Sequence, residues 1–168
     1  RGSKGYGQRF YQIAFSNGGQ GGYKMQDDKD DGVAWAVAEG LASRDRVAMF
    51  GWSYGGYAAL VAASRTPQIY QCVIAGAAVT DPEMQVNYYR YRLRGRSKVE
   101  QLRMWDDSVA PINEVEKVNV PILLIHGTVD QRVPLDHAKK YRKALLRAEK
   151  DHSYLELKGA DHFSNTLF

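Results

Sequence analysis

Residues 47–57 read VAMFGWSYGGY. The apolar first four residues are typical of a buried strand, and the small residues at 58–63 favour a helix that packs closely. Between them, Gly51-Trp52-Ser53-Tyr54-Gly55 fits G-x-S-x-G, a strand-to-helix turn that holds a serine in a strained backbone conformation. We expect side chains at positions 51 and 55 to collide with the neighbouring strand and helix or with a substrate. An ordinary tight turn could carry the same pattern, so the rest of the chain must decide.

Strand and helix patterns alternate along the chain. Further strands are predicted at residues 71–78, 120–127 and 153–157, and further helices at 27–41 and 135–147. This alternation predicts an α/β fold, a mostly parallel sheet with helices on both faces. In such sheets, chemistry gathers at the carboxyl ends of the strands.

Two segments carry weaker signals. The many glycines of residues 1–23 favour loops over regular structure. Residues 88–98 interleave tyrosines with basic residues, which predicts a solvated or lid-like segment. Binding of single-stranded nucleic acid, or an arginine that holds a substrate carboxylate, are the alternatives there.

Composition excludes several classes of protein. The 168 residues suit one domain, and the net charge of +4 is too mild to argue for nucleic-acid binding. The sequence contains no run of about 18 apolar residues, so no membrane span is predicted. Cys72 is the single cysteine, so an internal disulfide is impossible, and its apolar neighbours predict a buried thiol. The acidic residues at 27–31 suit a helix N-terminus better than a metal site, and nothing calls for a metal or organic cofactor.

The first residue is Arg1, and no initiator Met or signal peptide precedes it. We therefore expect the chain to be a segment of a longer protein. We expect a soluble protein, cytoplasmic or exported, whose targeting signal, if it has one, lies upstream of Arg1.

Ser53, Asp130 and His162 each follow a predicted strand, so all three fall on one edge of the sheet. Their order is that of α/β-hydrolase triads. We assign Ser53 as nucleophile, His162 as general base and then acid, and Asp130 as the carboxylate that orients the imidazole. The N–H of Tyr54, the residue after the nucleophile, is the predicted oxyanion donor.

Other histidines and carboxylates fit these roles less well. His126 ends a buried strand and is interpreted as structural, whereas His137 in a helix and His152 in a loop are expected to be exposed. Two carboxylates rival Asp130. Asp161 adjoins the histidine, which usually points two side chains apart, and Asp136 lies inside a helix.

The chain resembles the catalytic domain of the prolyl oligopeptidase family of serine peptidases, which includes acylaminoacyl peptidases, dipeptidyl peptidases and oligopeptidase B. The resemblance runs nearly the whole length and rests on Arg1-Gly2-Ser3, Gly5-Tyr6-Gly7, Gly51-Trp52-Ser53-Tyr54-Gly55-Gly56-Tyr57, His126-Gly127-Thr128-Val129-Asp130, Val133-Pro134 and Asp161-His162. It implies an α/β-hydrolase fold and the same triad.

The resemblance also implies parts that residues 1–168 do not contain. Family members usually carry an N-terminal β-propeller that restricts entry to short peptides, and an earlier loop that supplies a second oxyanion donor. Residues 1–168 are therefore expected to be the C-terminal part of an incomplete hydrolase domain, with a final helix after His162 that looks truncated.

Specificity is only partly suggested by the resemblance. Dipeptidyl peptidase IV-like members have an aromatic residue near the position of Pro82 and an asparagine at that of Arg132, which argues against that subgroup. Tyr89 stands where the family would place a substrate-pocket tyrosine, and Val133 is a candidate for the same pocket; loop packing is the alternative for both.

The resulting hypothesis is a serine peptidase that hydrolyses short peptides through an acyl-enzyme. A carboxylesterase-like ester hydrolase and a non-catalytic interaction domain derived from a hydrolase are the alternatives. Nucleic-acid binding is the least favoured.

Overall fold

The computed structural model describes residues 1–15, 21–105 and 108–163. The chain divides into two compact units. One contains Ser43–Asp81 and Ala110–Phe168 and carries the sheet, and the other contains Arg1–Ala42 and Pro82–Val109. The glycine-rich residues 16–20 and the residues after Phe163, on which part of the predictions fall, lie outside the described residues.

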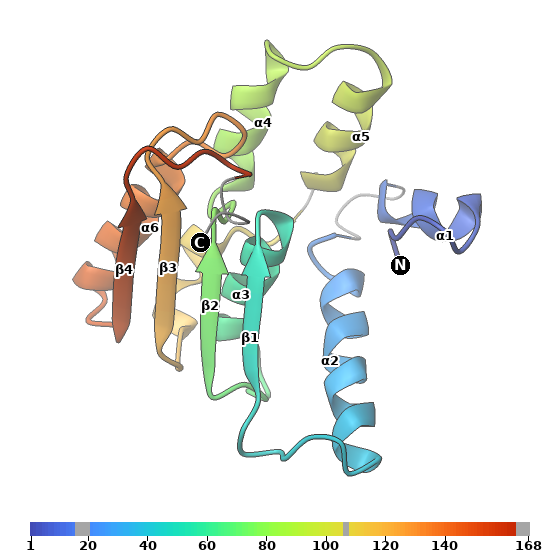
Figure 1. Ribbon diagram of the computed structural model, residues 1–168, viewed down its shortest axis with the longest axis vertical. Helices are drawn as coiled ribbons and strands as arrows, with labels where there is room; N and C mark the ends of the chain where they lie inside the picture. The colour runs from blue at the N-terminus through green and yellow to red at the C-terminus, as the bar shows by residue number, and fades with distance from the viewer. Residues whose placement is uncertain (16–20, 106–107, 164–168) are drawn as a thin grey trace. The chain divides into compact units, whose positions relative to one another are not determined.

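The sheet unit contains four parallel strands in the order in which they occur in the chain. They are β1 (Ala48–Trp52), β2 (Cys72–Gly76), β3 (Ile122–Gly127) and β4 (His152–Leu157). In the register, Trp52 stands opposite Gly76, Gly76 opposite Ile125, and Gly127 opposite Leu157. All four carboxyl ends therefore share one edge, at the top of Figure 1. The predicted α/β fold with a parallel sheet is confirmed.

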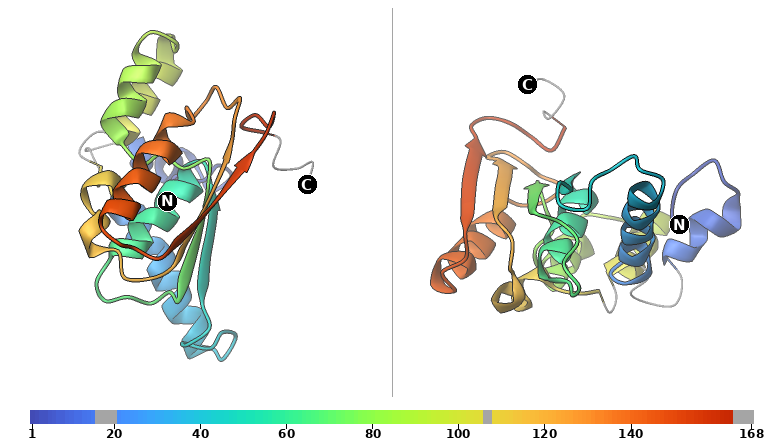
Figure 2. Two further views of the ribbon diagram at one scale, coloured as in Figure 1. Left: turned by 90° about the vertical axis from the view of Figure 1, so that its left-hand side faces the viewer. Right: turned by 90° about the horizontal axis from the view of Figure 1, so that it is seen from below.

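Two helices of this unit, α3 (Tyr54–Ser64) and α6 (Asp136–Arg147), lie on the same face of the sheet and not on opposite faces, as the predicted fold would allow (Figure 2). The short 3₁₀ helices Pro111–Asn113 and Val115–Lys117 lie directly before β3 in the chain. The core contains Tyr57 and Leu60 from α3 and Tyr141 and Leu145 from α6, which are all 0% exposed. Small residues of α3 let that helix approach the strands closely.

The opposite side of the sheet carries apolar side chains that stay partly exposed. Phe50 of β1 is 64% exposed and Leu155 of β4 is 48% exposed. The prediction of a fully buried strand at residues 47–50 is therefore wrong in part, because alternate residues of β1 point to the face that α3 does not cover. Cys72 is half-buried for the same reason. The prediction of a buried core thiol is therefore wrong.

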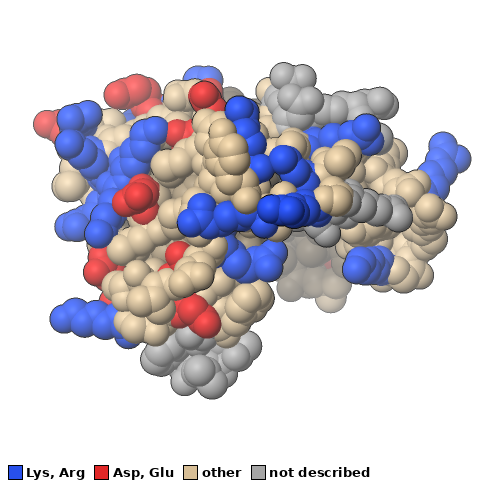
Figure 3. Space-filling view, turned by 90° about the horizontal axis from the view of Figure 1, so that it is seen from above, with Lys and Arg blue, Asp and Glu red and all other residues tan. Residues whose placement is uncertain are grey.

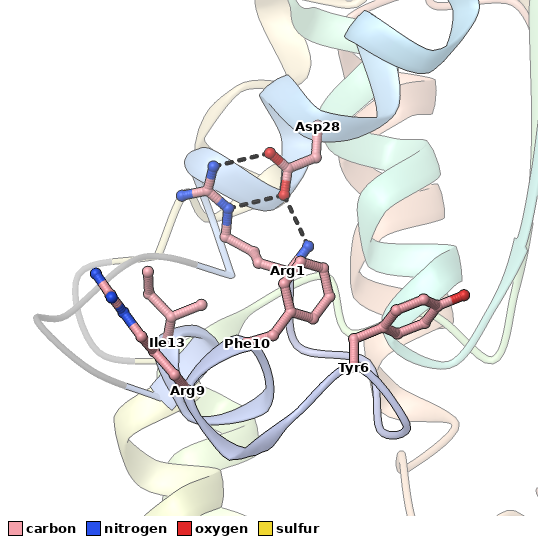
Figure 4. Close-up of a pocket in the computed structure, with 6 residues that line it drawn as sticks. All are labelled: Arg1, Tyr6, Arg9, Phe10, Ile13 and Asp28. Carbon is pink, nitrogen blue, oxygen red and sulfur yellow. Dashed lines mark hydrogen bonds and ion pairs between the residues drawn. The ribbon is translucent and has the colours of Figure 1, made fainter.

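The helical unit contains α1 (Gln8–Gln12), a 3₁₀ turn (Ile13–Phe15), α2 (Lys24–Ala38), α4 (Pro82–Arg90) and α5 (Gly95–Trp105). The Arg1 guanidinium donates two hydrogen bonds to Asp28 of α2, of 2.7 and 2.8 Å. Figure 4 shows this ion pair beside a hollow of about 570 Å³ whose other lining residues are Tyr6, Arg9, Phe10 and Ile13. Asp28, one of the acidic residues at 27–31, thus has an ion-pair partner.

Several local predictions need correction in the helical unit. Residues 8–15 are helical, although loops were predicted, because the glycines flank this stretch and none lies within it. Helix α2 begins three residues earlier than the acidic run and ends before Leu41, which is 70% exposed. Residues 88–98 contain the end of α4 and the start of α5, and residues 90–92, 94 and 95 are exposed, in agreement with the predicted solvated segment. The Arg92 guanidinium stacks on the Tyr88 ring at 4.0 Å.

The surface carries both signs of charge, with Lys and Arg the more numerous, as Figure 3 shows for one face. Within the described residues, no helix combines the length and the apolar character needed to cross a bilayer.

Two histidines lie where they were not expected. His137 in α6 is 0% exposed, because its Nδ1 accepts the backbone N–H of Thr80 at 3.1 Å inside the unit. His152 is half-buried and is the first residue of β4, with Nδ1 2.8 Å from the Lys150 carbonyl. The prediction that both are exposed is wrong.

The burial of His137 predicts a loss of stability in acid. Burial lowers the pKa of its imidazole from 6.5 to about 3. Between these values the unfolded chain binds a proton that the folded chain does not, so the free energy of unfolding falls as the pH falls, by about 1.4 kcal/mol per pH unit from this group. Urea unfolding of wild type and His137→Asn across this interval should show a shallower pH dependence in the variant. Equal slopes would contradict the prediction.

Candidate active site

Ser53 occupies the turn between β1 and α3 with φ 59° and ψ −117°. A positive φ is costly for a residue with a Cβ, by about 1–3 kcal/mol. The backbone is held in place by the Ser53 N–H, which donates to the Gly76 carbonyl at 2.8 Å, and by the Tyr57 N–H, which donates to the Ser53 carbonyl at 3.0 Å. The predicted strained serine is confirmed. Its hydroxyl makes no capping bond to α3.

Glycine is required at two positions around this turn. A Cβ on Gly51 would lie 2.1 Å from the Gly55 carbonyl oxygen, and a Cβ on Gly56 would lie 2.4 Å from the Gly76 oxygen. At Gly55, a Cβ would meet no atom of the described residues within 4 Å. The expected collision at Gly55 with a neighbouring strand or helix is therefore not found. The steric constraint falls on Gly51 and Gly56.

The side chain of His162 connects the other two predicted residues. Its Nε2 lies 2.8 Å from Ser53 Oγ, and its Nδ1 lies 2.7 Å from Asp130 Oδ2. An ionised carboxylate only accepts, so Nδ1 carries the proton and Nε2 is left to accept from the Ser53 hydroxyl. His162 is 6% exposed and Asp130 is 7% exposed, so this chain of hydrogen bonds is largely shielded from water.

Asp130 is held as an anion. Burial by itself would raise the pKa of its carboxyl, but the hydrogen bonds from His162 and from the backbone N–H groups of Val133 and Arg132 outweigh burial, and the pKa lies below its usual value of 3.8. The two N–H groups donate to Oδ1 at 2.9 and 2.8 Å, and the imidazole donates to Oδ2. The carboxylate therefore stays charged through neutral pH and can stabilise an imidazolium at His162.

A second histidine lies beside this carboxylate and bonds the backbone that holds it. His126, the penultimate residue of β3, is 1% exposed, and its Nε2 lies 2.9 Å from the Val133 carbonyl and 3.7 Å from Asp130 Oδ2. A carbonyl only accepts, so Nε2 carries the proton. Burial is the main reason that the pKa of His126 lies below 6.5, which keeps it neutral. The interpretation of His126 as structural agrees with this position.

The rival carboxylates lie elsewhere. Asp161 Oδ1 accepts the backbone N–H of Phe163, and Asp136 is an exposed residue of the first turn of α6. The structure brings Ser53, Asp130 and His162 together, and their catalytic roles stay predictions.

The remaining predicted residues are placed less decisively. Tyr54 is the first residue of α3, so its N–H lies at the positive end of that helix. Val133 is 2% exposed and contributes backbone bonds to Asp130 and His126. Tyr89 is 8% exposed within α4 of the helical unit. A substrate-binding role for Val133 and Tyr89 stays a prediction.

A hollow of about 380 Å³ opens beside His162. It is lined by Val129, Gln131, Arg132, Asp161, His162 and Phe163. The Arg132 guanidinium lies 5.6 Å from the centre of the Phe163 ring. His162 thus lines a surface hollow that also offers a cation and an aromatic ring.

Sequence analysis missed two donors at this site. Besides His126, the indole N–H of Trp52 donates to the His162 main-chain carbonyl at 2.9 Å. No motif or spacing predicts a contact between residues that are 110 positions apart. In chemical terms the arrangement can deprotonate a serine hydroxyl during attack on a carbonyl carbon and return the proton to the leaving group.

Known proteins are similar in sequence to most of this chain. The chain is 31% identical over 157 residues to dipeptidyl aminopeptidase BIII of Pseudoxanthomonas mexicana, a match that covers 86% of this chain and 22% of that protein. It is 30% identical over 152 residues to prolyl endopeptidase FAP of Mus musculus, covering 90% of this chain and 20% of the relative. The chain therefore spans about a fifth of the length of these relatives.

The fold has solved counterparts. A Pyrococcus horikoshii acylaminoacyl peptidase superposes with a TM-score of 0.80 at 22% identity, over 99% of this chain and 28% of that structure. At this identity the likeness shows the fold alone, the α/β-hydrolase fold that was expected. The model of the prolyl oligopeptidase family matches residues 1–166. The chain belongs to the prolyl oligopeptidase family.

Proposed function

We propose that this chain carries the catalytic residues of a serine peptidase that hydrolyses short peptides through an acyl-enzyme. The observation that carries the proposal is the continuous hydrogen-bonded series from Ser53 Oγ through His162 to Asp130, with contacts of 2.8 and 2.7 Å. Such a series activates a hydroxyl that is a poor nucleophile by itself.

In this mechanism Ser53 Oγ attacks the scissile carbonyl carbon while His162 Nε2 takes the hydroxyl proton. The imidazolium then gives that proton to the leaving amine, and the C–N bond breaks to leave an ester on Ser53. Water, deprotonated by His162, attacks the ester, and the proton returns to Ser53 Oγ as the acid departs. Asp130 stays ionised throughout and orients the imidazole.

Negative charge on the carbonyl oxygen needs hydrogen-bond donors in the transition state. The Tyr54 N–H at the start of α3 is the donor that we assign, and the positive end of that helix adds to it. A second donor would come from the earlier loop that the family resemblance implies. We also retain Val133 and Tyr89 as substrate-pocket residues of the complete enzyme.

The relatives support the peptide as substrate class, since the two curated relatives are named as an aminopeptidase and an endopeptidase. We further propose that the parent chain carries the rest of the hydrolase domain and an N-terminal propeller. The relatives' greater length supports this proposal. A carboxylesterase-like activity is the second candidate, because the same three side chains serve ester hydrolysis.

The function is tested by hydrolysis of a short peptide amide and of the ester of the same acyl group by the full-length protein. Ser53→Ala should lower both rates by at least about 10⁴-fold, because the nucleophile is lost. Ser64→Ala, at the other end of α3, is the matched control and should leave both rates near wild type. Ser53-dependent ester cleavage without amide cleavage would favour the esterase. Loss of neither activity in Ser53→Ala would overturn the assignment.

The role of Asp130 has its own test. Asp130→Asn should lower kcat by about 10⁴-fold with little change in KM, because an amide no longer selects the Nδ1–H tautomer of His162. Asp136→Asn, which changes an exposed carboxylate at the start of α6, should keep kcat within about twofold. Steady-state kinetics of both variants decide which of the two carboxylates orients His162. Greater loss in Asp136→Asn would transfer the orienting role to that residue.

A further inference from the structure

Trp52 precedes the nucleophile in the chain, yet its side chain reaches the loop that carries the base. Its indole Nε1–H donates to the main-chain carbonyl of His162 at 2.9 Å. An indole N–H is a donor only, and a carbonyl is an acceptor only, so the direction of this bond is unambiguous. One residue of β1 therefore presents Ser53 through its backbone and contacts His162 through its ring.

The Trp52 indole packs on a glycine of the neighbouring strand. Trp52 stands opposite Gly76 in the parallel pairing of β1 with β2. A Cβ on Gly76 would lie 2.0 Å from Trp52 Cε3 and 2.4 Å from Cζ3, so the ring rests directly on the glycine backbone. Gly76 also accepts the Ser53 N–H through its carbonyl. The Trp52 ring and the Ser53 backbone thus both contact Gly76 of β2.

Two further hydrogen bonds hold the loop around His162 at residues before the histidine. The Gly159 N–H donates to Thr128 Oγ1 at 2.8 Å, and the Ala160 carbonyl accepts the Val129 N–H at 3.1 Å. These bonds hold the loop to the end of β3, where Asp130 lies close by in the chain. The bond from Trp52 holds the backbone of His162 itself and relates it to β1.

We propose that Trp52 is a positioning residue that holds the His162 backbone so that Nε2 stays within hydrogen-bond reach of Ser53 Oγ. Without the bond, the loop would still be held toward Asp130, while the Oγ–Nε2 contact with Ser53 would lose the support that comes from β1. Attack requires that contact to be aligned in the transition state, and small misplacements of reacting groups are costly. This inference rests on the proposed peptidase function.

The test removes the donor and keeps an aromatic ring at position 52. In the full-length protein, Trp52→Phe should lower kcat by about 10- to 100-fold with KM within about twofold, and should slow labelling of Ser53 by a fluorophosphonate by a similar factor. Trp35→Phe, which changes a 60% exposed indole in α2, is the matched control and should leave both rates near wild type. A purely structural role would instead lower the melting temperature and leave the kcat of the folded protein unchanged.

Two further changes keep the proposal falsifiable if Trp52→Phe folds poorly. Incorporation of benzothienylalanine at position 52 replaces the N–H by sulfur and preserves the ring's shape, so it should reproduce the loss in kcat. Gly76→Ala should displace the indole while the donor remains, with a loss of the same kind. Normal kcat and labelling in the benzothienylalanine protein would overturn the proposal, as would a change confined to KM. A Ser53→Ala protein that stays active would instead refute the peptidase itself, so the two failures are distinguishable.

Discussion

The backbone at Ser53 turns so sharply that residues 51 and 55 nearly touch, and a Cβ at Gly51 would lie 2.1 Å from the Gly55 oxygen. This constraint places the serine at a positive φ and at the N-terminus of α3 at once. The turn is retained because neighbouring elements over-determine it: the Gly76 carbonyl accepts the Ser53 N–H, and Gly56 passes close to the same carbonyl. Packing of α3 against β1 and β2 therefore maintains the strain.

The parallel sheet converts this local turn into a site. Because β1, β3 and β4 run in one direction, the residues that follow them emerge along a single edge, and Ser53, Asp130 and His162 meet although 109 residues separate the first from the last. Contacts between the loops then refine the meeting. Gly127 permits the approach of Ala160, whose carbonyl would lie 2.3 Å from a Cβ there, and this brings the Asp130 loop against the His162 loop.

The charge and protonation of the site residues follow from their burial and from the hydrogen-bond partners that each one has. Asp130 is buried and ionised, because three donors compensate its lost hydration. His126 is equally buried, and its Nε2–H bonds a neutral carbonyl, so it stays uncharged. Two imidazoles thus lie near the same carboxylate and act differently. His162 donates a hydrogen bond to Asp130, whereas His126 bonds the carbonyl of Val133, whose N–H donates to Asp130.

The sequence by itself determined the α/β class, the order of the strands, the strained serine and the identity of the three residues that meet, because periodicity, glycine spacing and post-strand position are local properties. It misjudged His137, whose partner Thr80 lies 57 residues away, and it could not find the bond from Trp52 to His162. It also missed helices α4 and α5. The bonds of His137 and Trp52 join segments that are distant in the chain, and only the tertiary structure decides which side chains such contacts bury and which backbone groups they pair.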